Sequence, residues 1–559
     1  MSGIKEKLYN QIWLVILLIM AFIFYCHSMY ANKPWYDELY TYYYFISRGP
    51  VYAAIHWPVP NNHMGYSVIA AVFDLILGNY WGLRGLSVVC SVLNIYLVYR
   101  LAYKLCKDDR LLIVGCYMGA YLTYSLAFQG RGYALITTCL LVALNVLCEI
   151  CLKKDALYMY IVWICVLAWG LYTIASSTYW VIPVCLTGGS YLLITKQYKK
   201  LGRLIIASAI AAVITFFMYS VVWLAIGSNL LSKDASSVFY GIYQLNIIKS
   251  APLKAWSRGM QYMLDTPYIQ SIDRHEVITG LWGYFCSLFD QYYSYLHNSM
   301  GKVTCIVYIL SLVTALTDSV VSFINGKKTS DALTKEETND KKLCTERLLM
   351  IRVIVLIFGL CIPLMLIVQS VNPYLRVFSF FAAIIGFMAY YLLNRVMGLA
   401  ERFFKREDST CLIIRVGTGI CIFFMALLSN LIFSFGLTGK NGPYPIRLAD
   451  RENDIYHSLE QQKDTVKNID TIFYTDDFQK YVLKFYYDIE PVEVPLEEAG
   501  YIMMSEAFMS GSEQSDWPML VIKDYFDIGY VYDNFTPLNE IEESKKAGSH
   551  NPYILYRRK

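Results

Sequence analysis

Residues 11–30 read QIWLVILLIMAFIFYCHSMY, and after Ala31 the chain continues with the aromatic and acidic run NKPWYDELYTYYY at 32–44. Twenty residues without Asp, Glu, Lys or Arg are long enough to cross the hydrocarbon core of a bilayer as a helix. No small-residue cleavage pattern follows the apolar run, so it is expected to remain as a membrane anchor and not to be removed as a signal peptide.

The composition of the whole chain agrees with a membrane protein. Of its 559 residues, 56% are hydrophobic and only 16% are charged, and the mean hydropathy is +0.40. Soluble domains carry about 25% charged residues, so a soluble protein is excluded, and low charge with high hydrophobicity also excludes a disordered one. The net charge of +4 gives no reason to expect nucleic acid as a partner.

Ten further stretches resemble the first in length and apolar character. The eleven expected spans are 11–30, 82–104, 111–128, 132–151, 157–174, 177–195, 202–227, 301–323, 348–370, 375–395 and 411–434. With the N-terminus in the cytoplasm, every Lys- and Arg-rich connector falls on the cytoplasmic side, as the positive-inside rule requires. The opposite side then receives residues 31–81, residues 228–300 and the C-terminal tail.

The segment from His63 to Gly78 is apolar but short and contains Asp74. As a twelfth span it would reverse every later connector and expose the basic cluster Lys196–Arg203 outside, so an interfacial helix is expected here. A true span with a compensating error elsewhere is the alternative.

The tail is predicted to fold as a small α/β domain. Its expected elements are strands at Ile469–Tyr474, Val492–Val494 and Met519–Ile522 and a helix at Asp477–Tyr486. The expected fold class is therefore mainly α: a polytopic membrane bundle at 1–436, with external loops at 31–81 and 228–300, and an extracytoplasmic α/β domain at 437–559. Most of the 15 cysteines lie in apolar runs and are read as small apolar residues.

Asp37 and Glu38 are adjacent acids at the expected membrane boundary, among aromatic residues. Buried or interfacial carboxylates must be solvated, paired or bound to a cation. One interpretation is that they are first-turn acids of a surface helix, placed favourably for the helix dipole. The other is catalytic, because a carboxylate at this depth can deprotonate an acceptor near the head group of a lipid-linked substrate.

Four motifs in chain order resemble the GT-C superfamily of polytopic glycosyltransferases, in particular the branch of aminoarabinose transferases and protein O-mannosyltransferases. They are Trp35-Tyr36-Asp37-Glu38-Leu39-Tyr40, Asn61-Asn62-His63-Met64-Gly65-Tyr66, Leu83-Arg84-Gly85-Leu86-Ser87 and Gln129-Gly130-Arg131-Gly132-Tyr133-Ala134-Leu135. The resemblance covers about the first 200 residues by motif and the remainder by layout only. His63 stands where relatives carry a Lys-Pro-Pro, so a role of that lysine does not transfer to this chain.

The resemblance implies a GT-C-like fold, a polyprenyl-phosphate-linked sugar as donor, and a lipid, glycan or protein as acceptor. Arg84, Arg131 and Arg376 lie at expected outer helix ends, against the positive-inside trend, and a guanidinium suits phosphate. Salt bridges or contact with lipid head groups are the alternatives. His63 joins them as a candidate for binding the donor phosphate. The expected substrate-binding residues are Trp35, Tyr40, Asn62, Tyr66, Tyr133 and Tyr374.

The sequence thus predicts a membrane glycosyltransferase on the outer face of the cytoplasmic membrane of a bacterium. Asp37 is the expected general base, and Glu38 is expected to position the acceptor or a neighbouring cation. A divalent cation such as Mg or Mn is left open, since an adjacent Asp-Glu pair supplies too few ligands to require one. The alternatives are a flippase or other transporter of lipid-linked sugars, and a non-catalytic membrane scaffold.

Overall fold

The structure is a computed structural model, and it describes residues 2–56, 62–153, 155–232, 242–265, 270–329, 339–404, 408–435, 450–505, 528–538 and 553–559. The chain divides into two compact units. The first unit consists of Met1–Ala31 and Gly49–Tyr444, and the second of Asn32–Arg48 and Pro445–Lys559.

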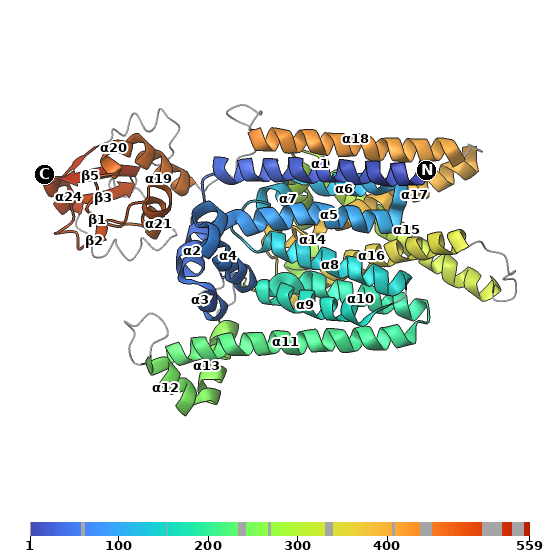
Figure 1. Cartoon of the computed structure of the whole chain (residues 1–559), viewed down its shortest axis with the longest axis horizontal. Coiled ribbons are helices and arrows are strands. Elements are labelled where there is room, and N and C mark those ends of the chain that lie inside the picture. The colour runs from blue at the N-terminus through green and yellow to red at the C-terminus, as the bar shows by residue number, and fades with distance from the viewer. Residues whose placement is uncertain are drawn as a thin grey trace. The chain divides into compact units, whose positions relative to one another are not determined.

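The first unit is a bundle of long helices that run side by side (Figure 1). Its long helices, with the short α7 that continues α6, are α1 (Ser2–Ala31), α5 (Leu86–Cys106), α6 (Arg110–Met118), α7 (Tyr121–Leu126), α8 (Tyr133–Leu152), α9 (Leu157–Thr173), α10 (Thr178–Ile194), α11 (Tyr198–Leu230), α15 (Met300–Thr329), α16 (Asn339–Gln369), α17 (Phe381–Phe404) and α18 (Asp408–Phe435). The mainly helical fold class expected from the sequence is confirmed.

By length and composition, nine helical stretches within the described ranges could cross a membrane. This count takes Trp81–Met118 as one stretch and omits α9, which has 17 residues. The chain turns back at Lys107, which has a φ of 47°, and α6 packs along α5. Each of the eleven expected spans therefore coincides with helix, although two of them differ in detail.

The differences concern spans 111–128 and 375–395. The first is interrupted between α6 and α7 at Gly119 and Ala120. The second begins earlier than the helix, because residues Leu375–Phe378 form a separate helical turn, η5, before α17 starts at Phe381. That turn carries Arg376, so the arginine lies on a turn and not inside a span.

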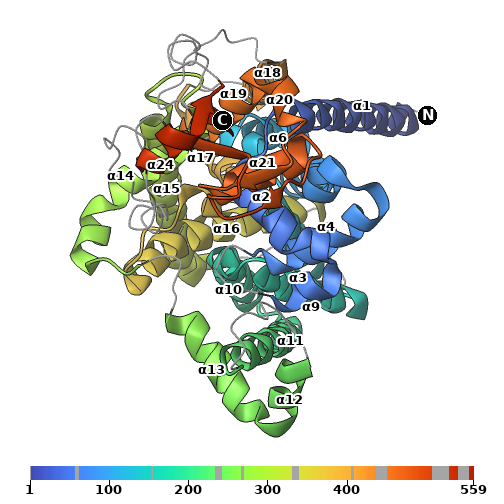
Figure 2. The same cartoon turned by 90° about the vertical axis from the view of Figure 1, so that its left-hand side faces the viewer.

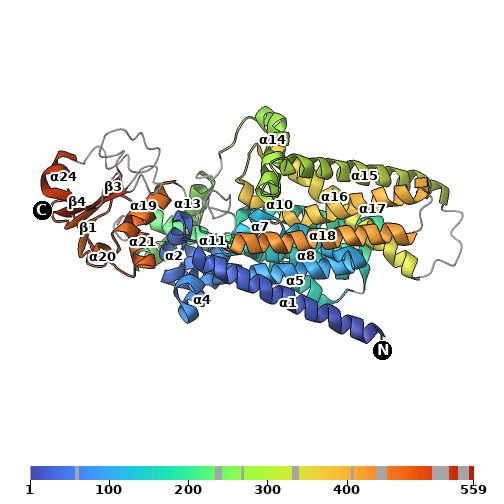
Figure 3. The same ribbon diagram turned by 90° about the horizontal axis from the view of Figure 1, so that it is seen from above.

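Five further helices of the described part gather at the end of the bundle where α1 and α11 finish. They are α3 (Pro50–Ile55), α4 (Met64–Leu77), α12 (Ile242–Ser250), α13 (Pro252–Asp265) and α14 (Arg274–Tyr293). α4 has 14 residues, too few to cross a bilayer, as expected for an interfacial helix. α12 and α13 lie beside the end of α11 (Figures 1 and 2), and α14 packs against α15 (Figure 3).

The second unit is an α/β domain built on a mixed sheet with strand order β2-β1-β3-β5-β4. Its elements are α2 (Tyr36–Tyr44), α19 (Asp450–Gln461), α20 (Lys463–Val466), α21 (Asp477–Tyr486), α24 (Ile528–Asn534), β1 (Thr471–Phe473), β2 (Val492–Glu493), β3 (Tyr501–Ser505), β4 (Phe535–Pro537) and β5 (Tyr553–Arg558). β1 pairs in parallel with β2 and β3, whereas β5 pairs antiparallel with β3 and β4. Ile502, Met504, Val531 and Ile554 form its apolar core.

The expected tail elements compare well with this domain where the structure describes them. α21 occupies the expected helix, and β1 and β2 lie within expected strands, but the strand expected at Met519–Ile522 falls outside the described residues. The expected domain boundary at 436/437 also falls in a part that is not described. One difference is clear: Asn32–Arg48, expected with the membrane domain, belongs to the second unit because its side chains pack on α19 and α21.

Candidate active site

His63 is the centre of a basic cluster in the first unit. It is the N-cap residue of α4 and is 5% exposed. Its Nδ1 accepts a hydrogen bond of 2.8 Å from the backbone N–H of Gly132, at the start of α8. Gly132 is required for this contact, since a Cβ there would lie 2.7 Å from Cγ2 of Thr173 and 3.2 Å from the histidine ring. Two helix starts are thereby joined through one imidazole.

The hydrogen bond from Gly132 fixes the tautomer of His63. A neutral imidazole has one donor and one acceptor nitrogen, so Nε2 carries the proton when Nδ1 accepts. Nη2 of Arg131 lies 3.2 Å from that Nε2, and a guanidinium nitrogen only donates. Two donors therefore lie side by side in a buried place, and one anionic oxygen beside them can accept hydrogen bonds from both.

The electrostatics at His63 also favour an anionic ligand. Burial, together with the charges of Arg131 and Arg376, holds the pKa of His63 well below its usual value. The imidazole is consequently neutral at pH 7, and the local positive charge comes from the two arginines. The N-terminus of α8 adds partial positive charge from its first-turn N–H groups. A phosphate is the kind of ligand that such a cluster binds.

Arg376 reaches this cluster from η5. Its Nε donates a 3.0 Å hydrogen bond to the hydroxyl of Tyr133, and its guanidinium lies 4.9 Å from the centre of the Tyr374 ring. The Tyr133 ring in turn packs edge-on against His63 at 5.1 Å. The structure thus brings together five of the predicted site residues, which are His63, Arg131, Tyr133, Tyr374 and Arg376.

The segment that carries Arg376 is held in place by tyrosines from neighbouring helices. The hydroxyl of Tyr284 donates to the carbonyl of Pro373 at 2.6 Å, and that of Tyr292 donates to the carbonyl of Phe378. The turn before Arg131 is held as well, because the Ser87 hydroxyl donates to the Gln129 carbonyl at 2.5 Å. Both arginines therefore stand on backbone fixed by side chains of other helices.

Three predicted site residues of the first unit contribute to the scaffold. Asn62 donates to the carbonyls of Ala53 and His56 at 3.0 and 2.7 Å and accepts from Ser67 at 2.8 Å, so it connects the end of α3 to the start of α4. The buried Tyr66 hydroxyl donates to the Leu83 carbonyl at 2.7 Å. Arg84 is fully buried and donates to the Met29 carbonyl near the end of α1 at 2.7 Å. The expected binding roles of these three residues stay predictions.

The two acids lie on α2 in the second unit and differ in their surroundings. Glu38 is fully buried, and its Oε2 accepts a 3.3 Å hydrogen bond from the backbone N–H of Trp35, the N-cap residue. This is the arrangement of a helix-capping acid. Asp37 is half-buried at the second helical position. Tyr40 stacks between Tyr36 and Tyr44 along the aromatic face of the helix, with ring centres 6.0 and 4.3 Å away.

Among the residues that the structure describes, no group of three or more His, Cys, Asp or Glu side chains is arranged to hold a metal ion.

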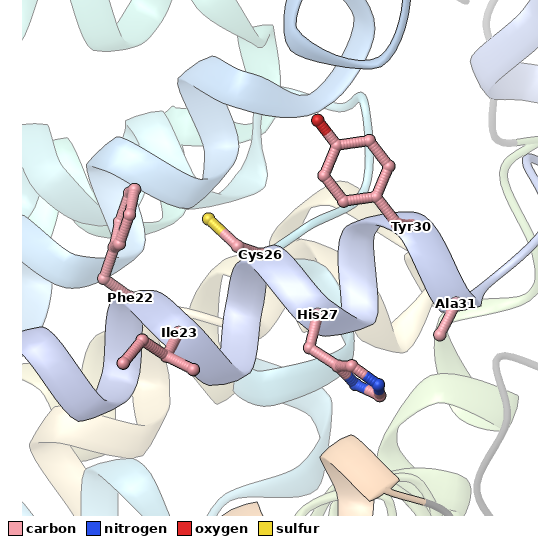
Figure 4. A pocket seen from close by; sticks show the side chains of 6 residues that line it. All are labelled: Phe22, Ile23, Cys26, His27, Tyr30 and Ala31. Carbon is pink, nitrogen blue, oxygen red and sulfur yellow. The ribbon is translucent and has the colours of Figure 1, made fainter.

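An apolar groove of about 580 Å³ runs along the last turns of α1 (Figure 4). Phe22, Cys26 and Tyr30 lie along one side of the helix, and Ile23, His27 and Ala31 along the other. Its lining is hydrocarbon except for the tyrosine hydroxyl, the thiol and the imidazole, so it suits a lipid chain better than a polar ligand.

No protein-family model matches the chain, and no curated protein matches it. Several solved structures are similar to the chain. ArnT from Cupriavidus metallidurans, bound to undecaprenyl phosphate, is 12% identical over 97% of both chains, with a TM-score of 0.49. The archaeal oligosaccharyltransferase AglB from Archaeoglobus fulgidus, in complex with an inhibitory peptide and a dolichol-phosphate, is 9% identical over 95% of this chain and 73% of the other, with a TM-score of 0.46.

A second structure of the Archaeoglobus fulgidus oligosaccharyltransferase, tethered to an acceptor peptide, is 11% identical over 95% and 73% of the two chains, with a TM-score of 0.39. The chain is similar to these proteins over nearly its whole length. Because the TM-scores of these three structures are below 0.5, the function proposed next depends on the residues of this chain. What the fold itself defines is a polytopic helical membrane protein with an additional α/β domain.

Proposed function

We propose that this protein is a glycosyltransferase that moves a sugar from a polyprenyl-phosphate donor to an acceptor at the outer face of the cytoplasmic membrane. The observation that carries the proposal is the pair of adjacent donors, Nε2–H of His63 and the Arg131 guanidinium, with Arg376 completing the cluster. The charge and the donor geometry of these groups suit a phosphate, whose oxygens can accept hydrogen bonds from several of them together.

A lipid-linked phosphate is favoured over a nucleotide. The cluster lies at the ends of membrane-length helices, and the sequence has no Gly-rich phosphate loop. A donor whose prenyl chain stays in the bilayer brings its phosphate to this depth. The apolar groove along α1 offers hydrocarbon surface in the same unit.

The basic cluster would act on the leaving group. During transfer the bond between the anomeric carbon of the sugar and the phosphate oxygen breaks, and its electrons stay on that oxygen. The polyprenyl phosphate gains negative charge as this happens. Arg131, Arg376 and the Nε2–H of His63 would stabilise this charge, which lowers the barrier for transfer.

Asp37 would take the proton from the acceptor hydroxyl or amine as the new bond to the sugar forms. Glu38 was expected to position the acceptor, but its burial and its hydrogen bond from the Trp35 N–H favour a role in capping α2. We therefore assign the role of general base to Asp37 and the role of capping the N-terminus of α2 to Glu38.

The test compares cells that contain the gene, lack it, or carry Asp37→Ala at equal expression. Mass spectrometry of envelope glycans and of lipid-linked sugars identifies the sugar and the acceptor. We expect a glycan that disappears without the gene and with Asp37→Ala, while its lipid-linked donor accumulates. A transporter would instead move lipid-linked sugar across sealed vesicles with Asp37→Ala unaffected, and that result would overturn the proposal.

Sidedness is tested separately with Asp37→Cys. A membrane-impermeant maleimide added to intact cells should label this cysteine. Labelling only after the cytoplasmic side is opened would contradict an extracytoplasmic active site.

A further inference from the structure

The helix that carries the proposed base is built into the C-terminal domain. Only four residues separate the end of α1 at Ala31 from the start of α2 at Tyr36, yet Asn32–Arg48 forms a compact unit with residues 445–559 and not with the bundle. The contacts within this unit show which residues determine the position of α2.

Glu452 of α19 holds the start of α2. Its Oε1 accepts a 3.0 Å hydrogen bond from the backbone N–H of Tyr36, the first residue of the helix. The side chain is 5% exposed, and 416 positions separate the two residues in the sequence. A carboxylate at a helix N-terminus satisfies a backbone donor and meets the positive end of the helix dipole. The residue directly after Tyr36 is Asp37.

Residues one and two turns further along α19 hold the extended segment before α2. The Tyr456 hydroxyl donates to the Pro34 carbonyl at 2.8 Å. Glu460 pairs with Lys33 at 2.7 Å, and the Lys33 ammonium lies 5.0 Å from the centre of the Tyr456 ring. Positions 452, 456 and 460 share one face of a helix because they recur every four residues. This face of α19 therefore contacts residues 33–36 in order.

Tyr481 of α21 supports the aromatic side of α2. Its ring stacks on Tyr43 with centres 5.5 Å apart and lies 6.2, 6.4 and 6.3 Å from Tyr36, Tyr40 and Tyr44. Aromatic pairs at these distances contribute beyond their buried area. With its start held by α19 and one side held by α21, α2 has little freedom to rotate or slide within this unit.

We propose that Glu452, assisted by Tyr456 and Tyr481, is a positioning residue that sets the place of Asp37 for proton removal, so that the C-terminal domain is part of the catalytic apparatus. The inference rests on the proposed function. It follows from geometry, because the N–H that Glu452 binds belongs to the residue next to the base. A small displacement of a reacting group is enough to slow a reaction strongly.

The experiment uses the full-length protein in nanodiscs with Glu452→Ala, Glu452→Gln and, as the matched control, Glu498→Ala, which removes an exposed glutamate of the same domain. The glutamine retains an oxygen that can accept the Tyr36 N–H, and the alanine does not. Hydrogen exchange of the peptide containing residues 32–44 reports on α2 without any substrate. Exchange of the Tyr36 amide should be about fivefold faster in Glu452→Ala, as expected for loss of a helix cap, and close to wild type in the other two variants.

Turnover is followed as release of polyprenyl phosphate from host lipid-linked sugars that are labelled in bulk with radioactive phosphate. In Glu452→Ala, kcat should fall about tenfold while KM for the donor pool stays within about twofold, because positioning of the base and not donor binding is affected. Glu452→Gln should restore kcat. If Glu452→Ala is too unstable to purify, Tyr456→Phe, which removes only the hydroxyl that binds Pro34, should show the same pattern to a smaller degree.

The two levels of the proposal fail in different ways. If Asp37→Asn leaves turnover unchanged, the proposed function is wrong whatever Glu452 does. If Asp37→Asn abolishes turnover but Glu452→Ala changes neither Tyr36 exchange nor kcat, or raises KM alone, the positioning role is wrong. Loss of turnover in both Glu452→Ala and Glu452→Gln would also contradict it, since the glutamine keeps the hydrogen bond.

Discussion

Nε2 of His63 lies 3.2 Å from Nη2 of Arg131 in a buried site, and both nitrogens carry hydrogen because Nδ1 of the same ring accepts from Gly132. One acceptor oxygen beside the two nitrogens can receive a hydrogen bond from each of them. The fold brings the three residues together from two motifs, and 68 positions separate His63 from Arg131 in the sequence. This arrangement is the structural reason for assigning phosphate binding to the cluster.

The first prediction concerns stability and pH. Burial, with Arg131 and Arg376 nearby, keeps the pKa of His63 far below its ordinary value, so the folded protein keeps this ring neutral. The unfolded chain takes up the proton near pH 6.5, so the contribution of His63 to stability is complete above that pH. It declines as the pH falls, by at most about 1.4 kcal/mol per pH unit until the folded pKa is reached.

Thermal unfolding of wild type and His63→Gln between pH 7.5 and pH 5 measures this effect. As the solution becomes more acidic, the melting temperature of the wild type should fall more than that of His63→Gln. If the melting temperatures of the two proteins change equally with pH, His63 does not titrate as its surroundings imply.

The second prediction concerns phosphate affinity. Arg131→Gln should weaken binding of farnesyl phosphate at least about tenfold, because hydrogen bonds to charged groups contribute about 1.5–3 kcal/mol. Farnesol, which lacks the phosphate, should bind wild type and variant equally. Arg274→Gln removes an exposed arginine on α14 and is the control. Equal loss of farnesol binding would mean that Arg131→Gln damages the fold and not a phosphate site.

The third prediction concerns Gly132. A methyl group here would meet Thr173 at 2.7 Å and the His63 ring at 3.2 Å. Gly132→Ala should therefore destabilise the protein by about 1–3 kcal/mol, the usual cost of overpacking, and should weaken farnesyl phosphate binding as the ring moves.

Gly283 on α14 is the matched control, because nothing lies within 4 Å of a Cβ built there. Gly283→Ala should be neutral or stabilising by up to about 1 kcal/mol, since alanine favours helix. Equal effects of the two substitutions on melting temperature would argue against close packing at Gly132.

The fourth prediction separates Glu38 from Asp37. Glu38→Ala removes the acceptor for the Trp35 N–H from a fully buried position and should cost about 1 kcal/mol or more of stability. Glu38→Gln keeps an acceptor and should retain most of the stability and turnover. If Glu38→Gln abolishes turnover in a folded protein, Glu38 acts on the substrate and its assignment as a capping residue is wrong.

The helices of the bundle could be predicted from the sequence because membrane length and apolar character are local properties. The helix α21 and the position of Arg376 near the start of a helix could also be predicted from local sequence. The break at Gly119 and Ala120 and the separate turn at Leu375–Phe378 do not interrupt the apolar pattern strongly, so the sequence did not predict these details of spans 111–128 and 375–395. Gly132 was quoted within a motif, but nothing local shows that it must admit His63 and Thr173.

The residues that hold α2 could not be predicted in the same way. Glu452 and Tyr481 contact α2 from more than 400 positions away, and neither stands in a recognisable motif. The backbone contacts of Asn62, Tyr66 and Arg84 could not be predicted for a related reason. A polar residue near a motif is compatible with substrate binding until its backbone partners are known, and those partners are the carbonyls of Ala53, Leu83 and Met29.

The central claim is that Asp37 deprotonates the acceptor while the His63 cluster holds the donor phosphate. The most direct measurement is the release of polyprenyl phosphate by purified wild type and Asp37→Asn in proteoliposomes supplied with labelled lipid-linked sugars and envelope acceptors. We predict that Asp37→Asn lowers kcat about 10²–10⁴-fold, the usual contribution of a general base, and binds farnesyl phosphate as tightly as wild type. Unchanged turnover in Asp37→Asn would contradict the account.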